Sequence, residues 1–282
     1  MSFSIAEAFR KAESEGRAAF IPFLTAGYPD YATAEEILVA LEDNGADVIE
    51  IGLPFSDPLA DGPTIQHSSR MALDNGVTPP EVFRFVSKVR SRLSCPLVIM
   101  TYVNPVLSMG LDSFAAKTKE TGASGVIIPD LPPEEADDWI KAAGEHDVDT
   151  IFLVAPNTPP SRAEFVASKT SGFLYYVSMT GTTGSDVVLS DDVLSHLSQV
   201  RTMSKAPVAI GFGISQPEQA SVLAQQADGV IVGSAIIREI TAHEGPKAQV
   251  QAVAGFARSM SQALHRGSSS AVTSNETQKR IA

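Results

Sequence analysis

The sequence predicts an α/β fold, specifically a (β/α)8 barrel with an extra N-terminal helix. Eight short apolar runs recur along the chain, and each is followed by a helical pattern. The runs are continuously apolar rather than alternating, which is typical of parallel strands buried on both faces. The length of 282 residues suits one barrel domain. A doubly wound open sheet uses the same alternation and is the alternative, but the count of eight and the length favour the barrel.

The expected elements follow one another without interruption. Strands are predicted at residues 19–25, 48–52, 97–103, 125–129, 150–154, 173–178, 208–213 and 229–233. Helices are predicted at residues 34–44, 80–93, 113–121, 133–145, 161–168, 191–203, 217–226 and 247–264. Thr33 is expected to cap the first of these helices, and Pro80 suits the first turn of the second. A further amphipathic segment, residues 5–15, is expected to cover the bottom of the barrel.

The chain is expected to form one catalytic domain over residues 1–265. No linker or shift in composition divides this part of the sequence. Residues 266–282 are polar, rich in serine and aperiodic, so a disordered tail is expected there.

Charge and composition exclude several classes of function. The net charge of -12 argues against general binding of nucleic acid or of anionic membranes. No run of 18 apolar residues occurs, and the first 16 residues resemble neither a secretory nor a transit peptide, so a soluble cytoplasmic protein is expected. The single cysteine, Cys95, excludes a disulfide or a thiolate metal cluster within the chain.

Glu50 is the first candidate catalytic residue. It lies inside the apolar strand predicted at residues 48–52, where an unpaired ionised carboxylate is costly. Burial should therefore raise its pKa toward neutrality, which suits a group that both gives and takes a proton. A structural pairing with a buried cation is the alternative, although lysine and arginine are absent from the predicted strand ends.

Asp61 is the second candidate, in the long loop after that strand. An aspartate before glycine is ordinary turn chemistry, so its local sequence alone favours a structural role. Long apolar loops at strand ends are, however, usually functional or mobile. Both interpretations stay open at this point.

Glycines at the ends of the last two predicted strands indicate a phosphate site. Gly211, Gly213 and Gly233 would let backbone N–H groups approach an anion, and Ser234 follows. The loops after strands 7 and 8 are the usual phosphate site of such barrels. Residues 179–185, rich in glycine and threonine, are predicted to form a flap over it.

The absence of other groups narrows the chemistry. None of the five histidines and no lysine falls at a predicted strand end, which disfavours a histidine-bound metal and a Schiff-base aldolase. The residues therefore predict carboxylate acid/base catalysis on a phosphorylated substrate, without a cofactor.

Residues 49–66, which read IEIGLPFSDPLADGPTIQ, closely resemble the signature of tryptophan synthase α subunits. Further matches in the same order occur at residues 22–27, 102–105, 129–132, 181–184, 211–215 and 232–235. The resemblance covers roughly residues 1–265. It implies a (β/α)8 barrel that splits indole-3-glycerol phosphate into indole and glyceraldehyde 3-phosphate by a retro-aldol reaction, in tryptophan biosynthesis.

The resemblance also implies roles for individual residues. Glu50 matches the family's acid/base residue and Asp61 the carboxylate that binds the indole N–H. The residues implied to flank the indole or line the site are Phe23, Tyr102, Ile127, Leu153 and Tyr175. Those implied to bind phosphate are Gly184, Gly213, Gly233 and Ser234. Three more residues of the matching motifs are expected to contact substrate: Thr25, Thr183 and Phe212.

A partner is implied as well, namely the β subunit, a pyridoxal-phosphate enzyme that receives indole through a tunnel in an α2β2 complex. The loop after the second strand, Asn104 and Pro132 would lie at that interface. Three alternatives remain: a stand-alone lyase that releases free indole, a non-catalytic activating barrel, and another phosphate-binding barrel such as a sugar-phosphate isomerase.

Overall fold

The computed structural model describes residues 4–177, 191–211 and 213–266. The expected flap at residues 179–185 lies outside the described residues, as does the expected tail apart from Arg266. No helix in the described ranges is long and apolar enough to cross a membrane.

Parallel strands form a closed barrel. Their bounds are β1 (Ala19–Thr25), β2 (Ile49–Gly52), β3 (Leu97–Met100), β4 (Gly125–Ile127), β5 (Asp149–Ile151), β6 (Leu153–Val154), β7 (Leu174–Val177), β8 (Val208–Gly211) and β9 (Gly229–Val232). The hydrogen-bonded order is β5-β4-β3-β2-β1-β9-β8-β7-β6.

The two outermost strands of that order, β5 and β6, are two halves of one strand interrupted only at Phe152. The first half pairs with β4 and the second with β7. The carbonyl of Phe152 also accepts the N–H of Tyr175 at 2.9 Å. The sheet therefore closes on itself as an eight-stranded barrel within the described residues, and the open doubly wound alternative is wrong.

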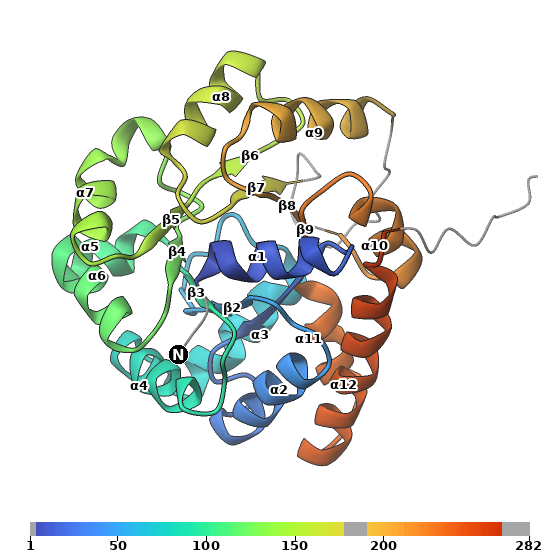
Figure 1. Cartoon of the computed structure of the whole chain (residues 1–282). Coiled ribbons are helices and arrows are strands. Elements are labelled where there is room, and N and C mark those ends of the chain that lie inside the picture. Colours follow the sequence, from blue (N-terminus) through green and yellow to red (C-terminus); the bar gives the residue numbers. More distant parts are fainter. Residues whose placement is uncertain (1–3, 178–190, 212, 267–282) are drawn as a thin grey trace, which may run out of the picture.

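Helices surround the strands (Figure 1). Their bounds are α1 (Ile5–Ser14), α2 (Tyr31–Asp43), α3 (Pro63–Asp74), α4 (Pro79–Arg90), α5 (Val103–Met109), α6 (Leu111–Glu120), η1 (Pro133–Glu135), α7 (Asp137–Glu145), α8 (Pro160–Lys169), α9 (Asp191–Met203), α10 (Pro217–Ala224), α11 (Ser234–Thr241) and α12 (Pro246–Ala263).

The first residues of two helices differ from those expected from the sequence. The cap of α2 is Asp30, whose carboxylate accepts the N–H of Thr33 at 2.9 Å, so Thr33 lies inside the helix. The second of the predicted helices, α4, starts at Pro79 and not at Pro80. Its cap is Thr78, which forms a capping box with Glu81.

Other boundaries differ from the sequence predictions because short helices lie directly beside strands. β3 ends at Met100, and α5 begins at Val103, inside the strand predicted to reach residue 103. The helix predicted at residues 133–145 is divided at Ala136 into η1 and α7. The helices α3, α5 and α11 were not predicted, because each begins within a segment interpreted as a loop or strand end.

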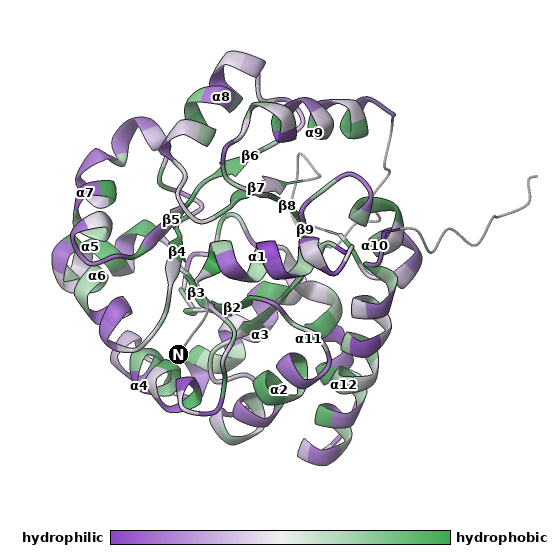
Figure 2. Cartoon of the chain, viewed as in Figure 1, coloured by the Kyte–Doolittle hydropathy of each residue, from purple (hydrophilic) through white to green (hydrophobic). Residues whose placement is uncertain are grey.

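The extra N-terminal helix covers the barrel bottom, as predicted. Figure 1 shows α1 lying across the ring of strands. Its apolar residues Ile5 and Phe9 join the cluster of side chains inside the barrel. The rings of Phe9 and Phe173 lie 5.7 Å apart. Apolar strands enclosed by helices of mixed polarity are visible in Figure 2. The described side chains at the bottom of the barrel are therefore packed against one another.

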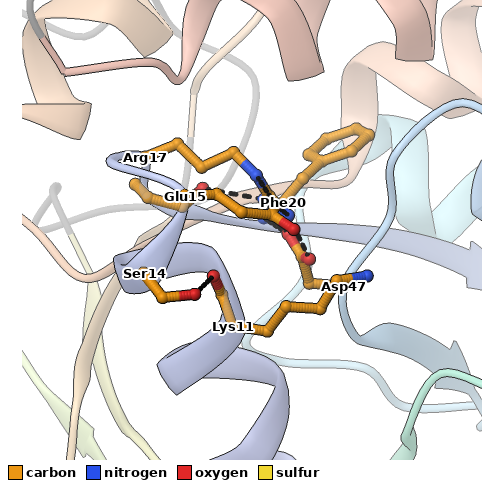
Figure 3. Close-up of polar contacts among 7 residues, drawn as sticks. Lys11, Ser14, Glu15, Arg17, Phe20 and Asp47 are labelled. Carbon is orange, nitrogen blue, oxygen red and sulfur yellow. Dashed lines mark hydrogen bonds and ion pairs between the residues drawn. The ribbon is translucent and has the colours of Figure 1, made fainter.

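A buried ion pair joins the first two strands at the bottom (Figure 3). The Arg17 guanidinium, just before β1, donates to both carboxylate oxygens of Asp47, just before β2. The same carboxylate accepts the N–H of Phe20 at 2.8 Å. Both side chains are at most 9% exposed. A bidentate pair of this kind fixes the positions of the two strand starts relative to each other.

We predict that Asp47→Ala lowers the free energy of unfolding by ~3–5 kcal/mol, because it leaves the buried Arg17 charge without its principal partner. Denaturant unfolding at neutral pH measures this loss. The control is Asp74→Ala, which breaks the exposed i,i+4 pair with Arg70 and should change stability little. Equal effects of the two variants would contradict the importance assigned to Asp47.

Candidate active site

A cavity of about 400 Å³, part of it open to solvent, lies at the carboxyl ends of the strands. It is lined by Phe23, Glu50, Asp61, Ile65, Met100, Tyr175, Gly213, Ile231, Gly233 and Ser234. Two carboxylates, aromatic rings and the start of one helix therefore share one hollow at the face where barrel active sites form.

Strand alternation points Glu50 into the barrel. Its neighbours Ile49 and Ile51 belong to the cluster packed between strands and helices, so the intervening side chain faces inward. Register places Glu50 between Phe23 of β1 and Val98 of β3.

The Glu50 side chain is 1% exposed, and neither carboxylate oxygen has a hydrogen-bond partner among the described residues. Burial, with a smaller contribution from the negative charge of Asp61, raises the pKa of Glu50 to about 8. The alternative of a pairing with a buried cation finds no support in these contacts.

Asp61 reaches the same cavity from the loop between β2 and α3. The Tyr102 hydroxyl accepts the N–H of Ala60 at 3.0 Å and hydrogen-bonds the Asp61 carboxylate. An ionised carboxylate only accepts, so the Tyr102 hydroxyl donates its own proton to Asp61. Burial raises the pKa of Asp61 to about 6, and the bond from Tyr102 opposes part of that rise. Asp61 is thus the more readily ionised of the two carboxylates.

Two aromatic rings need glycines beside them. A Cβ on Gly52 would lie 2.5 Å from the Phe23 ring, and one on Gly211 would lie 2.5 Å from the Tyr175 hydroxyl. Gly211, expected to serve anion binding, thus makes room for Tyr175. Burial, together with the charges of Glu50 and Asp61, holds the pKa of Tyr175 well above its ordinary value. The phenol therefore stays neutral in the cavity.

The far end of the cavity is the start of α11. Gly233 is its N-cap residue, and the N–H groups of Ile236 and Ile237 both turn back to the Gly233 carbonyl. The N–H groups at the first helical positions, Ser234 and Ala235, precede the intrahelical hydrogen bonds and carry the positive end of the helix dipole. Gly213, on the loop after β8, has φ +76 and also lines this end. Such a helix start suits an anion.

Metal ligands do not gather anywhere in the part of the chain that the structure describes. His196 lies between the Tyr176 hydroxyl, 2.9 Å away, and the Thr158 carbonyl, 3.0 Å away, on the helix side of β7. His146 pairs with Asp112 at 2.8 Å. These two histidines have structural partners outside the cavity.

Comparison with known proteins agrees with this geometry. The family model described as tryptophan synthase alpha chain matches residues 9–265. The chain belongs to the tryptophan synthase alpha chain family. A relative of that name from Gloeobacter violaceus is 45% identical over 92% of this chain and 94% of its own length. One from Geobacter sp. strain M21 is 42% identical over 94% and 98%.

Solved structures give the same result. Mycobacterium tuberculosis tryptophan synthase superposes with a TM-score of 0.86 at 36% identity, covering 95% of this chain and all of the other. The tryptophan synthase alpha subunit of Legionella pneumophila gives a TM-score of 0.83 at 35% identity, covering 92% and 97%.

Seven of the expected site residues line the cavity: Phe23, Glu50, Asp61, Tyr175, Gly213, Gly233 and Ser234. Tyr102 lies behind Asp61, and the Thr25 hydroxyl contacts Ser68, 2.6 Å away. Ile127 and Leu153 belong to the interior cluster below the cavity rather than to its lining. Thr183, Gly184 and Phe212 lie outside the described residues.

Ile65, Met100 and Ile231 line the cavity without having been expected there. Alternation along the strands offered a signal for two of them, because Met100 and Ile231 occupy inward positions of β3 and β9. Ile65 lies in the first turn of α3. Because that helix was not predicted, no pattern in the sequence indicated that Ile65 faces the cavity.

We predict that Glu50 makes stability depend on pH. Its pKa is about 8 in the folded chain against an ordinary value of 4.5. The folded state therefore holds the proton that the unfolded state loses, and stability falls as pH rises from about 4.5 to about 8. Glu50→Gln, which stays neutral, should gain a few kcal/mol relative to the parent chain over that range.

Urea unfolding at intervals between about pH 5 and pH 9 measures this difference. Asp74→Asn, a substitution at an exposed carboxylate, is the control and should leave the pH dependence of the parent chain unchanged. Parallel stability curves for Glu50→Gln and the parent chain would mean that Glu50 ionises in the folded state as it does in water.

Proposed function

We propose that this alpha-chain family member cleaves indole-3-glycerol phosphate to indole and glyceraldehyde 3-phosphate, with Glu50 and Asp61 as its catalytic carboxylates. The observation that carries the proposal is the presence of two buried carboxylates with different environments in one cavity. Such a pair can hold one proton donor and one ionised group at the same pH. Membership of this family indicates which reaction to expect, a carbon–carbon lyase reaction, and which substrate the carboxylates act on.

The cavity suits the two ends of this substrate. Phe23 and Tyr175 supply apolar and aromatic surface beside the carboxylates, where a flat indole ring would lie. The start of α11, with Gly213, Gly233 and Ser234, offers backbone N–H groups for the phosphate. Thr183, Gly184 and Phe212 are proposed to complete the site, with Ile127, Leu153 and Tyr102 supporting the ring pocket.

The carboxylates would act in sequence on the indole. Protonated Glu50 gives its proton to C3 of the ring, and the resulting positive charge spreads to the ring nitrogen. Ionised Asp61 accepts the indole N–H and stabilises that charge in a site with little water. The Glu50 carboxylate, now ionised, then takes the proton of the C3′ hydroxyl, and the C3′ carbon becomes the aldehyde of glyceraldehyde 3-phosphate as the bond between C3 and C3′ breaks. The electron pair of that bond returns to the ring and gives neutral indole, and Glu50 ends the cycle protonated as it began.

No cofactor is required by this scheme, because the protonated indole itself accepts the electrons of the breaking bond. A Schiff base or a metal would serve the same purpose in other aldol cleavages. The alpha chain is accordingly proposed to work without either.

The proposed partner is the tryptophan synthase β subunit, a pyridoxal-phosphate enzyme, in a cytoplasmic α2β2 complex. Leu59, on the loop after β2, is 87% exposed, and Leu107, on α5 with Asn104, is 57% exposed. Exposed apolar side chains on this loop and this helix support a protein interface there, to which the family resemblance adds Pro132. The alpha-chain names of the relatives do not favour a stand-alone lyase.

We predict that the purified chain releases indole from indole-3-glycerol phosphate slowly, and faster once a cognate β subunit is added. Glu50→Gln should lower kcat by at least about 10²-fold, because it removes the proton donor. Asp61→Asn should lower it by about 10²-fold through loss of charge stabilisation. Colorimetric indole measurement, with and without the β subunit, tests both.

Asn104→Ala is a useful companion, because it should weaken the response to the β subunit while leaving the two carboxylates intact. Unchanged activity of Glu50→Gln and Asp61→Asn under both conditions would refute the catalytic assignment. Turnover of a triose phosphate without consumption of indole-3-glycerol phosphate would instead favour a sugar-phosphate isomerase.

We also predict a bell-shaped pH profile of kcat/KM for the free enzyme. Activity should fall below about pH 6, where Asp61 becomes protonated, and above about pH 8, where Glu50 loses its proton. Since the two groups interact, the two limbs belong to the pair. The residual activity of Asp61→Asn should no longer fall at acid pH. A fall that persists in this variant would mean that another group causes it.

A further inference from the structure

A buried hydroxyl chain connects the end of β1 to the first turns of α3. The Thr25 and Ser68 hydroxyl oxygens lie 2.6 Å apart. The Ser68 hydroxyl also lies 2.9 Å from the carbonyl oxygen of Ile65. Thr25 and Ser68 are both 0% exposed, so water does not compete with either contact.

The direction of each hydrogen bond in this hydroxyl chain follows from counting protons. A carbonyl oxygen only accepts, so Ser68 gives its single hydroxyl proton to Ile65. The proton between Thr25 and Ser68 must then come from Thr25. Thr25 therefore donates to Ser68, and Ser68 donates to Ile65, which leaves no spare donor in the chain.

Both ends of this hydroxyl chain, Thr25 and Ile65, adjoin the candidate site. Thr25 pairs in register with Gly52, two residues after Glu50 on the inward face of β2. Ile65 lines the cavity, and Asp61 precedes α3 by two residues. The helix also packs against β1 and α11. The hydroxyl chain thus ties the strand pair that carries Glu50 to the helix start that carries Asp61.

We propose that Thr25 and Ser68 are positioning residues, which fix the start of α3 against β1 and so set how Asp61 and Ile65 face Glu50. The inference rests on the proposed function and adds residues that act through the catalytic pair. Thr25 then serves the reaction by holding α3 rather than by touching substrate. Loss of the bond should misplace Asp61 slightly, which lowers kcat more than it raises KM.

The test compares Thr25→Val, Ser68→Ala, the double variant and Thr25→Ser in the complete chain with a cognate β subunit. Thr25→Val and Ser68→Ala should each lower kcat on the order of tenfold, and Thr25→Ser should restore most of it. The double variant should show the same kcat as the single variants, because all three lack one shared bond. Thr118→Val, which removes an equally buried hydroxyl bonded to the Phe114 carbonyl on α6, is the control.

Thermal unfolding separates positioning from mere stability. Ser68→Ala leaves the buried Thr25 hydroxyl without its acceptor and should lower Tm most, whereas the double variant should recover much of that loss. Recovered Tm with kcat still about tenfold low supports positioning.

Three other results overturn the inference: kcat that follows Tm through all variants, Thr25→Val with the kcat of the parent chain, or a raised KM in Thr25→Val alone. The last result would make Thr25 a substrate contact. All three results can be obtained only if the parent chain is active. An inactive parent chain would instead contradict the proposed function, so the two failures can be told apart.

Discussion

The constraint on which the candidate site depends is a buried carboxylate, Glu50, with no hydrogen-bond partner among the residues that the structure describes. Glu50 occupies an inward position where the neighbouring strands offer Phe23 and Val98 and no polar partner. An ionised group there is costly, so the barrel keeps the proton on Glu50 up to about pH 8. The closed apolar floor under it, completed by α1, keeps this environment free of solvent from below.

The contrast with Asp61 arises from the chain segment that carries each group. A strand residue cannot turn away from its neighbours, whereas Asp61 lies on a loop that places it within reach of the Tyr102 hydroxyl. Asp61 starts from the lower ordinary pKa of 3.8, against 4.5 for Glu50, and the hydrogen bond from Tyr102 and its slightly smaller burial keep its pKa at about 6, below the value of about 8 for Glu50. The fold thereby provides a proton donor and an anion in one cavity near neutral pH.

The sequence predicts what periodicity controls and misses what tertiary packing controls. The barrel, the plugging helix and the buried Glu50 follow from apolar runs and their spacing. The helix starts of α3 and α11 escape prediction, because Asp61-Gly62-Pro63 and Gly233-Ser234 have the composition of turns. Gly211 looked like an anion-binding glycine, yet its space is taken by Tyr175 from the neighbouring strand. Such cross-strand fits depend on register, which no local pattern in the sequence shows.

The two ends of the barrel show why the costly group is tolerated. At the bottom, Arg17 and Asp47 neutralise each other and satisfy the N–H of Phe20, so the buried charges there hold strand starts in place. At the top, Glu50 has no such partner within the described ranges and is expected to lower stability as the pH rises. A cation beside Glu50 would relieve that cost, but it would also lower the pKa and remove the proton donor. The pair of Arg17 and Asp47 thus lies at the bottom of the barrel, and the carboxylate proposed as the proton donor faces the cavity at the other end.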